Sequence, residues 1–128
     1  MKFSKYGYKE LQPALNECYD YITKIAKISN RSDFIDSVND LKKCNIKFWP
    51  WFWNNAITLS SGEIRLSKKW KDKDLISKSA ILLHESFHLV QYRNGSLNWI
   101  NYWTNRYKIE LEAEKYEQLF RYLAKNNG

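Results

Sequence analysis

Two histidines and a glutamate, in the order His84-Glu85-Ser86-Phe87-His88, form the most chemically specific segment of the sequence. On a helix, residues four apart project from one face about 6 Å apart, and one zinc ion with Zn–N bonds of roughly 2.0–2.1 Å can span that gap. Glu85 lies about 100° further round the helix, within reach of a water molecule on the metal. The spacing predicts His84 and His88 as Zn²⁺ ligands and Glu85 as the general base.

The alternative is that these are two core histidines beside a chance glutamate. The helix that carries them is almost wholly apolar, and no other histidine occurs in the chain. Two neutral imidazoles in such a helix would each need a polar partner, whereas one metal ion satisfies both. We therefore favour zinc over a purely structural pair.

A catalytic zinc usually has three protein ligands, and the third is expected among carboxylates of the last helix. Periodicity alone favours Glu112, but close approach of two helices requires a small residue one turn on, and Ala113 follows Glu110 at that spacing. We therefore predict Glu110, with Glu112 as the alternative metal ligand. Glu114, four residues after Glu110, is predicted to accept the second ring N–H of a ligating histidine.

The pattern His84-Glu85-x-x-His88 followed by Glu110-x-x-Ala113-Glu114 resembles that of gluzincin metallopeptidases. It is also similar to the small intracellular ImmA/IrrE-like and uncharacterised bacterial or phage HExxH domains, over about residues 56–120. The resemblance implies peptide-bond hydrolysis, with a strand beside the metal helix holding an extended peptide substrate by main-chain pairing. Residues 64–66 are the segment that we expect to act as this edge.

Such enzymes often add a donor that stabilises the oxyanion of the tetrahedral intermediate. No third histidine is available for that role. Tyr92, Arg106 and Tyr107 are the candidates for the oxyanion or substrate contact, and the sequence does not choose among them.

The elements that must position these residues are mainly helical. Residues 1–45 predict two helices, one near 10–28 with Pro13 in its first turn and one capped by Ser32. Residues 46–70 contain an aromatic segment and a β-hairpin that turns at 60–63. We expect the aromatic cluster, residues 48–53, to form core or a cover over the sheet, with a substrate groove, a partner surface or a sugar-binding face as the alternatives.

Two further helices complete the predicted domain. The HExxH helix occupies 72–93, with Asp72 or Asp74 as its cap, and the glutamate helix occupies 98–125. The fold class is therefore α+β, a mainly helical zincin-like minidomain with a small β-hairpin beside the HExxH helix. Residues 1–128 form a single domain, because the length leaves too little chain for two.

Charge and cysteine content narrow the function classes. The chain has 21 Lys and Arg against 14 Asp and Glu, a net charge of +7, but few arginines, so nucleic acid is a partner that we do not favour. Cys18 and Cys44 are expected to be buried thiols, and no leader or membrane span is apparent. We expect a cytoplasmic protein with a peptide or protein substrate.

Two other function classes stay open. One is a basic nucleic-acid- or protein-binding module that keeps a non-catalytic zinc site. The other is an accessory protein of a phage or mobile element, with the aromatic cluster as an oligomer interface. The sequence leaves the oligomeric state open.

Overall fold

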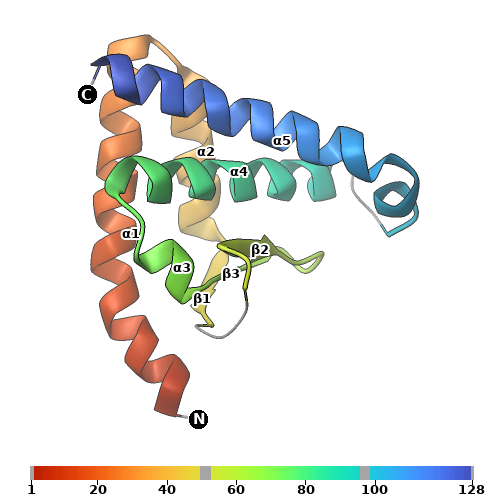
Figure 1. Cartoon of the computed structure of the whole chain (residues 1–128), viewed down its shortest axis with the longest axis horizontal. Helices are drawn as coiled ribbons and strands as arrows, with labels where there is room; N and C mark the ends of the chain where they lie inside the picture. Colours follow the sequence, from red (N-terminus) through yellow and green to blue (C-terminus); the bar gives the residue numbers. More distant parts are fainter. Residues whose placement is uncertain (1, 50–52, 96–98, 128) are drawn as a thin grey trace.

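The structure, a computed structural model, is an α+β fold of helices around a small mixed sheet (Figure 1). It describes the backbone of residues 2–49, 53–95 and 99–127, and the side chains of 11–49, 53–95 and 105–127. The elements in chain order are α1 (Lys2–Ser29), α2 (Ser32–Lys43), β1 (Asn45–Phe48), β2 (Ala56–Thr58), β3 (Glu63–Leu66), α3 (Lys68–Lys71), α4 (Leu75–Arg93) and α5 (Trp99–Asn127).

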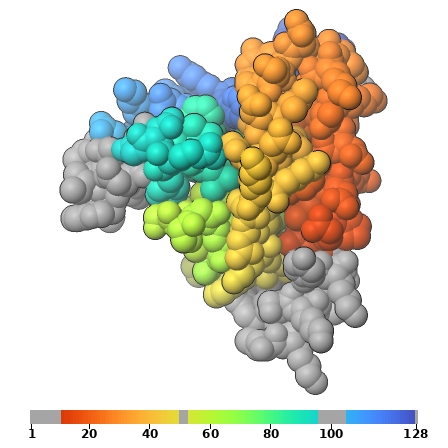
Figure 2. Space-filling model, turned by 180° about the vertical axis from the view of Figure 1, so that it is seen from behind, coloured from red at the N-terminus to blue at the C-terminus, as the bar shows by residue number. Residues whose placement is uncertain are grey.

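The two N-terminal helices form as the apolar spacing predicts, with different starts. α1 begins at Lys2, so Pro13 stands inside the helix and not in its first turn, where its missing N–H would matter less. α2 has Arg31 at its N-cap and no side-chain capping bond, so the predicted capping role of Ser32 is wrong. Figure 2 shows α2 and β1 as one ridge between α1 and the C-terminal end of α4.

The sheet has the order β1-β3-β2. The predicted hairpin is confirmed, since β2 pairs antiparallel with β3 and Thr58 lies opposite Ile64. On its other side β3 pairs in parallel with β1. This third strand makes β3 central, so the prediction that residues 64–66 form the open edge is wrong. β2 is the edge strand on the hairpin side.

The aromatic segment divides between core and surface. Phe48 is buried at the end of β1, whereas Trp49 packs against the Arg65 guanidinium and Trp53 is 82% exposed. The rest of the predicted aromatic cluster, residues 50–52, lies outside the described residues. For the described part, the prediction of a core or cover holds for Phe48 and fails for Trp53.

α4 runs through the middle of the fold, between α5 on one side and the sheet on the other (Figure 1). Asp74 caps it, accepting a hydrogen bond from Ser77 N at 2.8 Å, which agrees with one of the two predicted caps. α5 continues through a kink at Asn105, where the backbone leaves helical geometry (φ −125°, ψ 23°). The two helices that must carry the metal ligands are therefore packed neighbours.

Tyr116 joins α5 to α2. Its hydroxyl donates to the Asp33 carbonyl at 3.1 Å and accepts from Ser37 Oγ at 2.6 Å, because a phenol has one proton and a carbonyl can only accept. The Tyr116 ring also packs on Phe34 and Phe87. α5 is thus held by α2 as well as by α4.

None of the helices, within the residues that the structure describes, combines the length and apolar character that a membrane span needs.

Candidate metal centre

α4 presents both histidines from one face because they stand four residues apart. Their ring centroids are 5.0 Å apart, and their side chains are only 19% and 10% exposed, for His84 and His88 respectively. α4 also carries fully buried core side chains such as Leu82 and Leu83. The helix is thus fixed by its apolar contacts, and the imidazoles have little freedom to turn away.

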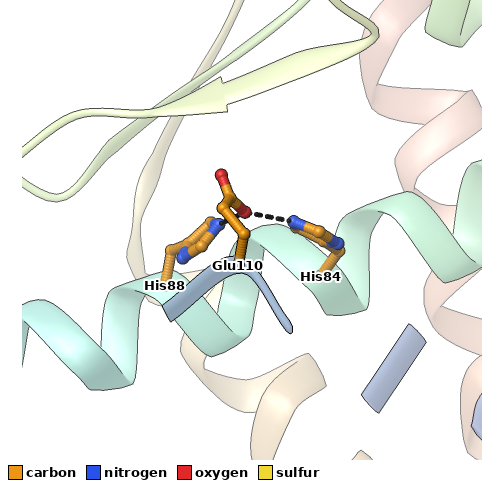
Figure 3. A group of neighbouring side chains, drawn as sticks. All are labelled: His84, His88 and Glu110. Carbon is orange, nitrogen blue, oxygen red and sulfur yellow. Dashed lines mark hydrogen bonds and ion pairs between the residues drawn. The ribbon is translucent and has the colours of Figure 1, made fainter. Parts of the chain in front are cut away.

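Glu110 of α5 closes the group (Figure 3). Its Oε1 atom lies 3.2 Å from His84 Nε2 and 3.0 Å from His88 Nε2. Ala113, one turn on, is fully buried and allows this close approach of the helices. The three donor atoms lie within 4.8 Å of one another, and both nitrogen–oxygen separations are close to the ~3.3 Å between ligands of a tetrahedral zinc.

Gln91 determines which nitrogen of His88 carries a proton. The Gln91 Nε2 group donates to the Ile109 carbonyl at 3.2 Å and to Glu112 Oε1 at 3.3 Å, both of which can only accept. Gln91 Oε1 is therefore the atom 2.7 Å from His88 Nδ1, and it must accept a proton from that nitrogen. His88 Nε2 is left facing Glu110.

Glu117 has the same effect on His84. Its Oε1 lies 2.8 Å from His84 Nδ1, and its Oε2 accepts from Arg121 Nε and Nη2 at 2.9 and 2.7 Å. Although burial works to raise it, hydrogen bonds from His84 and Arg121 hold the pKa of Glu117 below its usual value. A carboxylate can only accept, so His84 Nδ1 donates and Nε2 faces Glu110.

The site consequently requires positive charge between the imidazoles and Glu110. If both rings were neutral, each Nε2 would turn its lone pair toward the same carboxylate oxygen. Burial alone would lower the pKa of His84, but hydrogen bonds to Glu110 and Glu117 raise it to about 10. Hydrogen bonds to the two imidazoles hold the pKa of Glu110 well below its usual range. A divalent cation would meet the same demand without placing two imidazolium ions side by side.

Glu85 lies beside this group with one polar partner in the described structure. It is 7% exposed, and its Oε1 accepts from Thr58 Oγ1 at 2.7 Å. Burial raises the pKa of the Glu85 carboxyl. Thr58 belongs to β2, so its hydroxyl connects the edge strand to the predicted base.

A cleft of about 1230 Å³ opens over the group. α4 contributes His84, Glu85 and His88 to its walls, α5 contributes Glu110 and Glu117, and residues 56–58 form the side made by β2. Trp53 lines the cleft and is the most exposed of the described aromatic residues there. The three predicted ligands and the predicted base therefore share one solvent-accessible space.

Two of the predicted glutamates do not join the site. Glu112 is exposed and contacts Gln91, not either imidazole. Glu114 is also exposed, and the carboxylate at His84 Nδ1 is that of Glu117, so the prediction for Glu114 is wrong. The reason is helical rotation: the position seven after Glu110 is about 20° from it around the axis, whereas the position four after is about 40° away on the other side.

The three oxyanion candidates are separated by the fold. Tyr92 lies in the described wall of the cleft. Arg106 and Tyr107 are exposed on α5 outside that wall, Tyr107 to 81%. Tyr92 is therefore the one of the three candidates that lines the same cleft as the predicted ligands.

Sequence reasoning missed the outer partners of the site. Gln91 follows His88 by three residues, and a polar residue at that position of an apolar helix is a signal that could have been used. Thr58 gave no signal, because its partner is distant in sequence.

Comparison of the chain with protein-family models, with curated proteins and with solved structures gives no match.

Proposed function

We propose that this protein is a zinc-dependent peptidase in which His84, His88 and Glu110 hold the metal and Glu85 is the general base. One observation carries the proposal. The protons on both Nδ1 atoms are committed to outer partners, so both Nε2 atoms converge on one Glu110 oxygen. Two nitrogens and one oxygen are a donor set that zinc takes in catalytic sites, with a further position left for water.

The metal and the side chains of the protein have different roles in the proposed reaction. When bound, zinc supplies a Lewis acid that polarises a carbonyl group and makes a water molecule more acidic. Glu85 takes the proton of the attacking water and returns it to the leaving amine. Its burial, which raises the pKa of the carboxyl, strengthens it as a base, and Thr58 holds Oε1 so that Oε2 is free to meet the water.

A peptide substrate is favoured by the edge of β2. Bonds from Leu59 N to Glu63 O and from Ser67 N to Asn55 O flank the β2–β3 pair. Bonded and non-bonded pairs alternate along an antiparallel ladder, so the backbone N–H and C=O groups of Ala56 and Thr58 point away from β3. Both residues line the cleft, where an extended peptide can add as a further strand.

The test is cleavage of denatured casein by the zinc-loaded protein, with new N-termini identified by mass spectrometry. We expect wild type to bind one zinc and cleave. Glu85→Gln is expected to keep the zinc and lose about 10²–10⁴-fold in rate, because the general base is gone.

Glu17→Gln is the matched control, since it makes the same chemical change at an exposed position of α1. It is expected to cleave like wild type. A wild-type protein that takes up no zinc, or a Glu85→Gln variant that cleaves at the wild-type rate, would refute the proposal.

A further inference from the structure

Gln91 is a buried amide that contacts both helices of the metal centre. It is 4% exposed and belongs to α4. Its carbonyl end faces His88 of its own helix, and its amino end faces α5, at the Ile109 carbonyl and Glu112. Ile109 directly precedes Glu110. One side chain therefore touches one predicted ligand and the backbone next to another.

The contacts of Gln91 require an amide and no other side chain. His88 Nδ1 needs an acceptor when Nε2 is to be a ligand, and the Ile109 carbonyl needs a donor. A carboxylate would serve His88 but would place its charge against the Ile109 carbonyl and Glu112. An apolar residue of the same volume would serve neither partner.

The two imidazoles also have unlike outer partners. His84 donates to Glu117, a carboxylate that is itself paired with Arg121. His88 donates to the neutral carbonyl of Gln91. The site thus has a charged partner on one histidine and an uncharged one on the other. Both contacts join α4 to α5, but only Gln91 reaches the backbone beside Glu110, at the Ile109 carbonyl.

We propose that Gln91 is a positioning residue of the metal centre, which keeps His88 in the Nδ1–H tautomer and fixes Glu110 against it. The inference rests on the metal site proposed above and adds to it a residue that touches neither the metal nor the substrate. Outer partners of metal-bound histidines typically change metal affinity 10–100-fold when they are removed.

The test compares three variants with wild type in two measurements. Zinc affinity is measured by competition with a chromophoric chelator, and the protonation of the His88 ring is read by NMR of ¹⁵N-histidine-labelled, zinc-loaded protein. Gln91→Met keeps the volume and removes both contacts. Gln91→Glu keeps the acceptor for His88 and removes the donor to α5. Ser79→Ala is the control, a buried polar change on α4 outside the described cleft wall.

Gln91→Met is expected to bind zinc 10–100-fold more weakly and to lose the slowly exchanging Nδ1 proton of His88. Gln91→Glu is expected to keep that proton and still bind zinc more weakly than wild type, because the link to Ile109 is broken. Ser79→Ala is expected to match wild type in both measurements.

The outcomes separate this inference from the proposed function. If wild type binds zinc and both Gln91 variants bind it within twofold of wild type, the inference is overturned and the metal site stands. If wild type binds no zinc, both are overturned. Should Gln91→Met fail to fold, Gln91→Glu decides, since wild-type affinity in that variant contradicts a role for the donor to α5.

Discussion

The two walls of the cleft are built by different means. The wall made by α4 and α5 is fixed by side-chain contacts, in which His84, His88, Glu110 and Glu117 all have polar partners. The wall made by β2 presents backbone edge groups, and nearby stands Trp53, which is 82% exposed. Under the proposed function, the helical wall would perform the chemistry and the strand wall would bind the substrate. Substitutions in the first should alter metal binding and rate, and substitutions in the second should alter substrate affinity.

Loss of a metal ligand is the strongest test of the helical wall. His84→Ala is expected to weaken zinc binding by more than the 10–100-fold that outer partners contribute, and to abolish cleavage. Zinc should raise the melting temperature of wild type, because a ligand that binds only the folded state stabilises it, and chelation should reverse the rise. The measurements are zinc content and thermal unfolding with and without zinc. An unchanged zinc content would place the metal elsewhere.

Substituting a carboxylate that supports a histidine is expected to have a smaller effect on zinc binding, and Glu117 and Glu114 can be compared directly. Glu117→Gln is expected to weaken zinc binding 10–100-fold, because an amide can present its N–H to His84 Nδ1 and supports the ring less well. Glu114→Gln, three residues earlier on the exposed side of α5, is expected to bind zinc like wild type. Chelator competition on both variants measures this difference. Equal losses would mean that the contact between Glu117 and His84 does not support metal binding.

Thr58 lies where the two walls meet. Thr58→Val keeps the shape of the side chain and removes the hydroxyl that holds Glu85. We expect kcat to fall about tenfold, equivalent to about 1.4 kcal/mol, while zinc affinity and KM stay at wild-type values. Steady-state kinetics on a peptide identified in the casein digest separate these parameters. A change confined to KM would assign Thr58 to substrate binding alone.

Trp53 gives the smallest expected effect and tests the strand wall. Trp53→Ala is expected to change the free energy of unfolding by no more than about 0.5 kcal/mol, because the side chain is exposed. KM should rise several-fold and kcat should not change. Denaturant unfolding and kinetics on the same peptide provide both values. A lower kcat at unchanged KM would contradict the division between the walls.

The central helix and the grouping of His84, His88 and Glu110 could be predicted from sequence because their signals are local. The spacing of His84 and His88 on one helix gives their common face, and Ala113 indicates the close approach that Glu110 needs. The one-turn spacing from Glu110 predicts Glu114, whereas two turns bring a residue closer to the starting face, and Glu117 stands at that position. Helical periodicity thus gives the correct helix and an incorrect residue when two candidates differ by a small rotation.

The sheet shows what local signals leave out. Alternation identified β2 and β3, but it does not show which of them has a second neighbour. The pairing of β1 with β3 joins strands that are separated in the sequence by residues 49–62, and it makes β3 central. Thr58 has no local signal for the same reason, because its partner Glu85 comes from long-range packing. For Gln91 the contact with His88 is local, but its contacts with Ile109 and Glu112 are not.

The hydrogen bonds of the Tyr116 hydroxyl to α2 lead to an expectation for genetic screens. Tyr116 immediately precedes Glu117, and its bonds to Asp33 and Ser37 brace the helix that carries the acidic ligand. If the proposed peptidase activity is correct, selections for its loss should therefore recover substitutions in α2, a helix that does not line the described cleft. Such lesions would look like folding defects in the cell, yet surplus zinc in the growth medium would partly restore them.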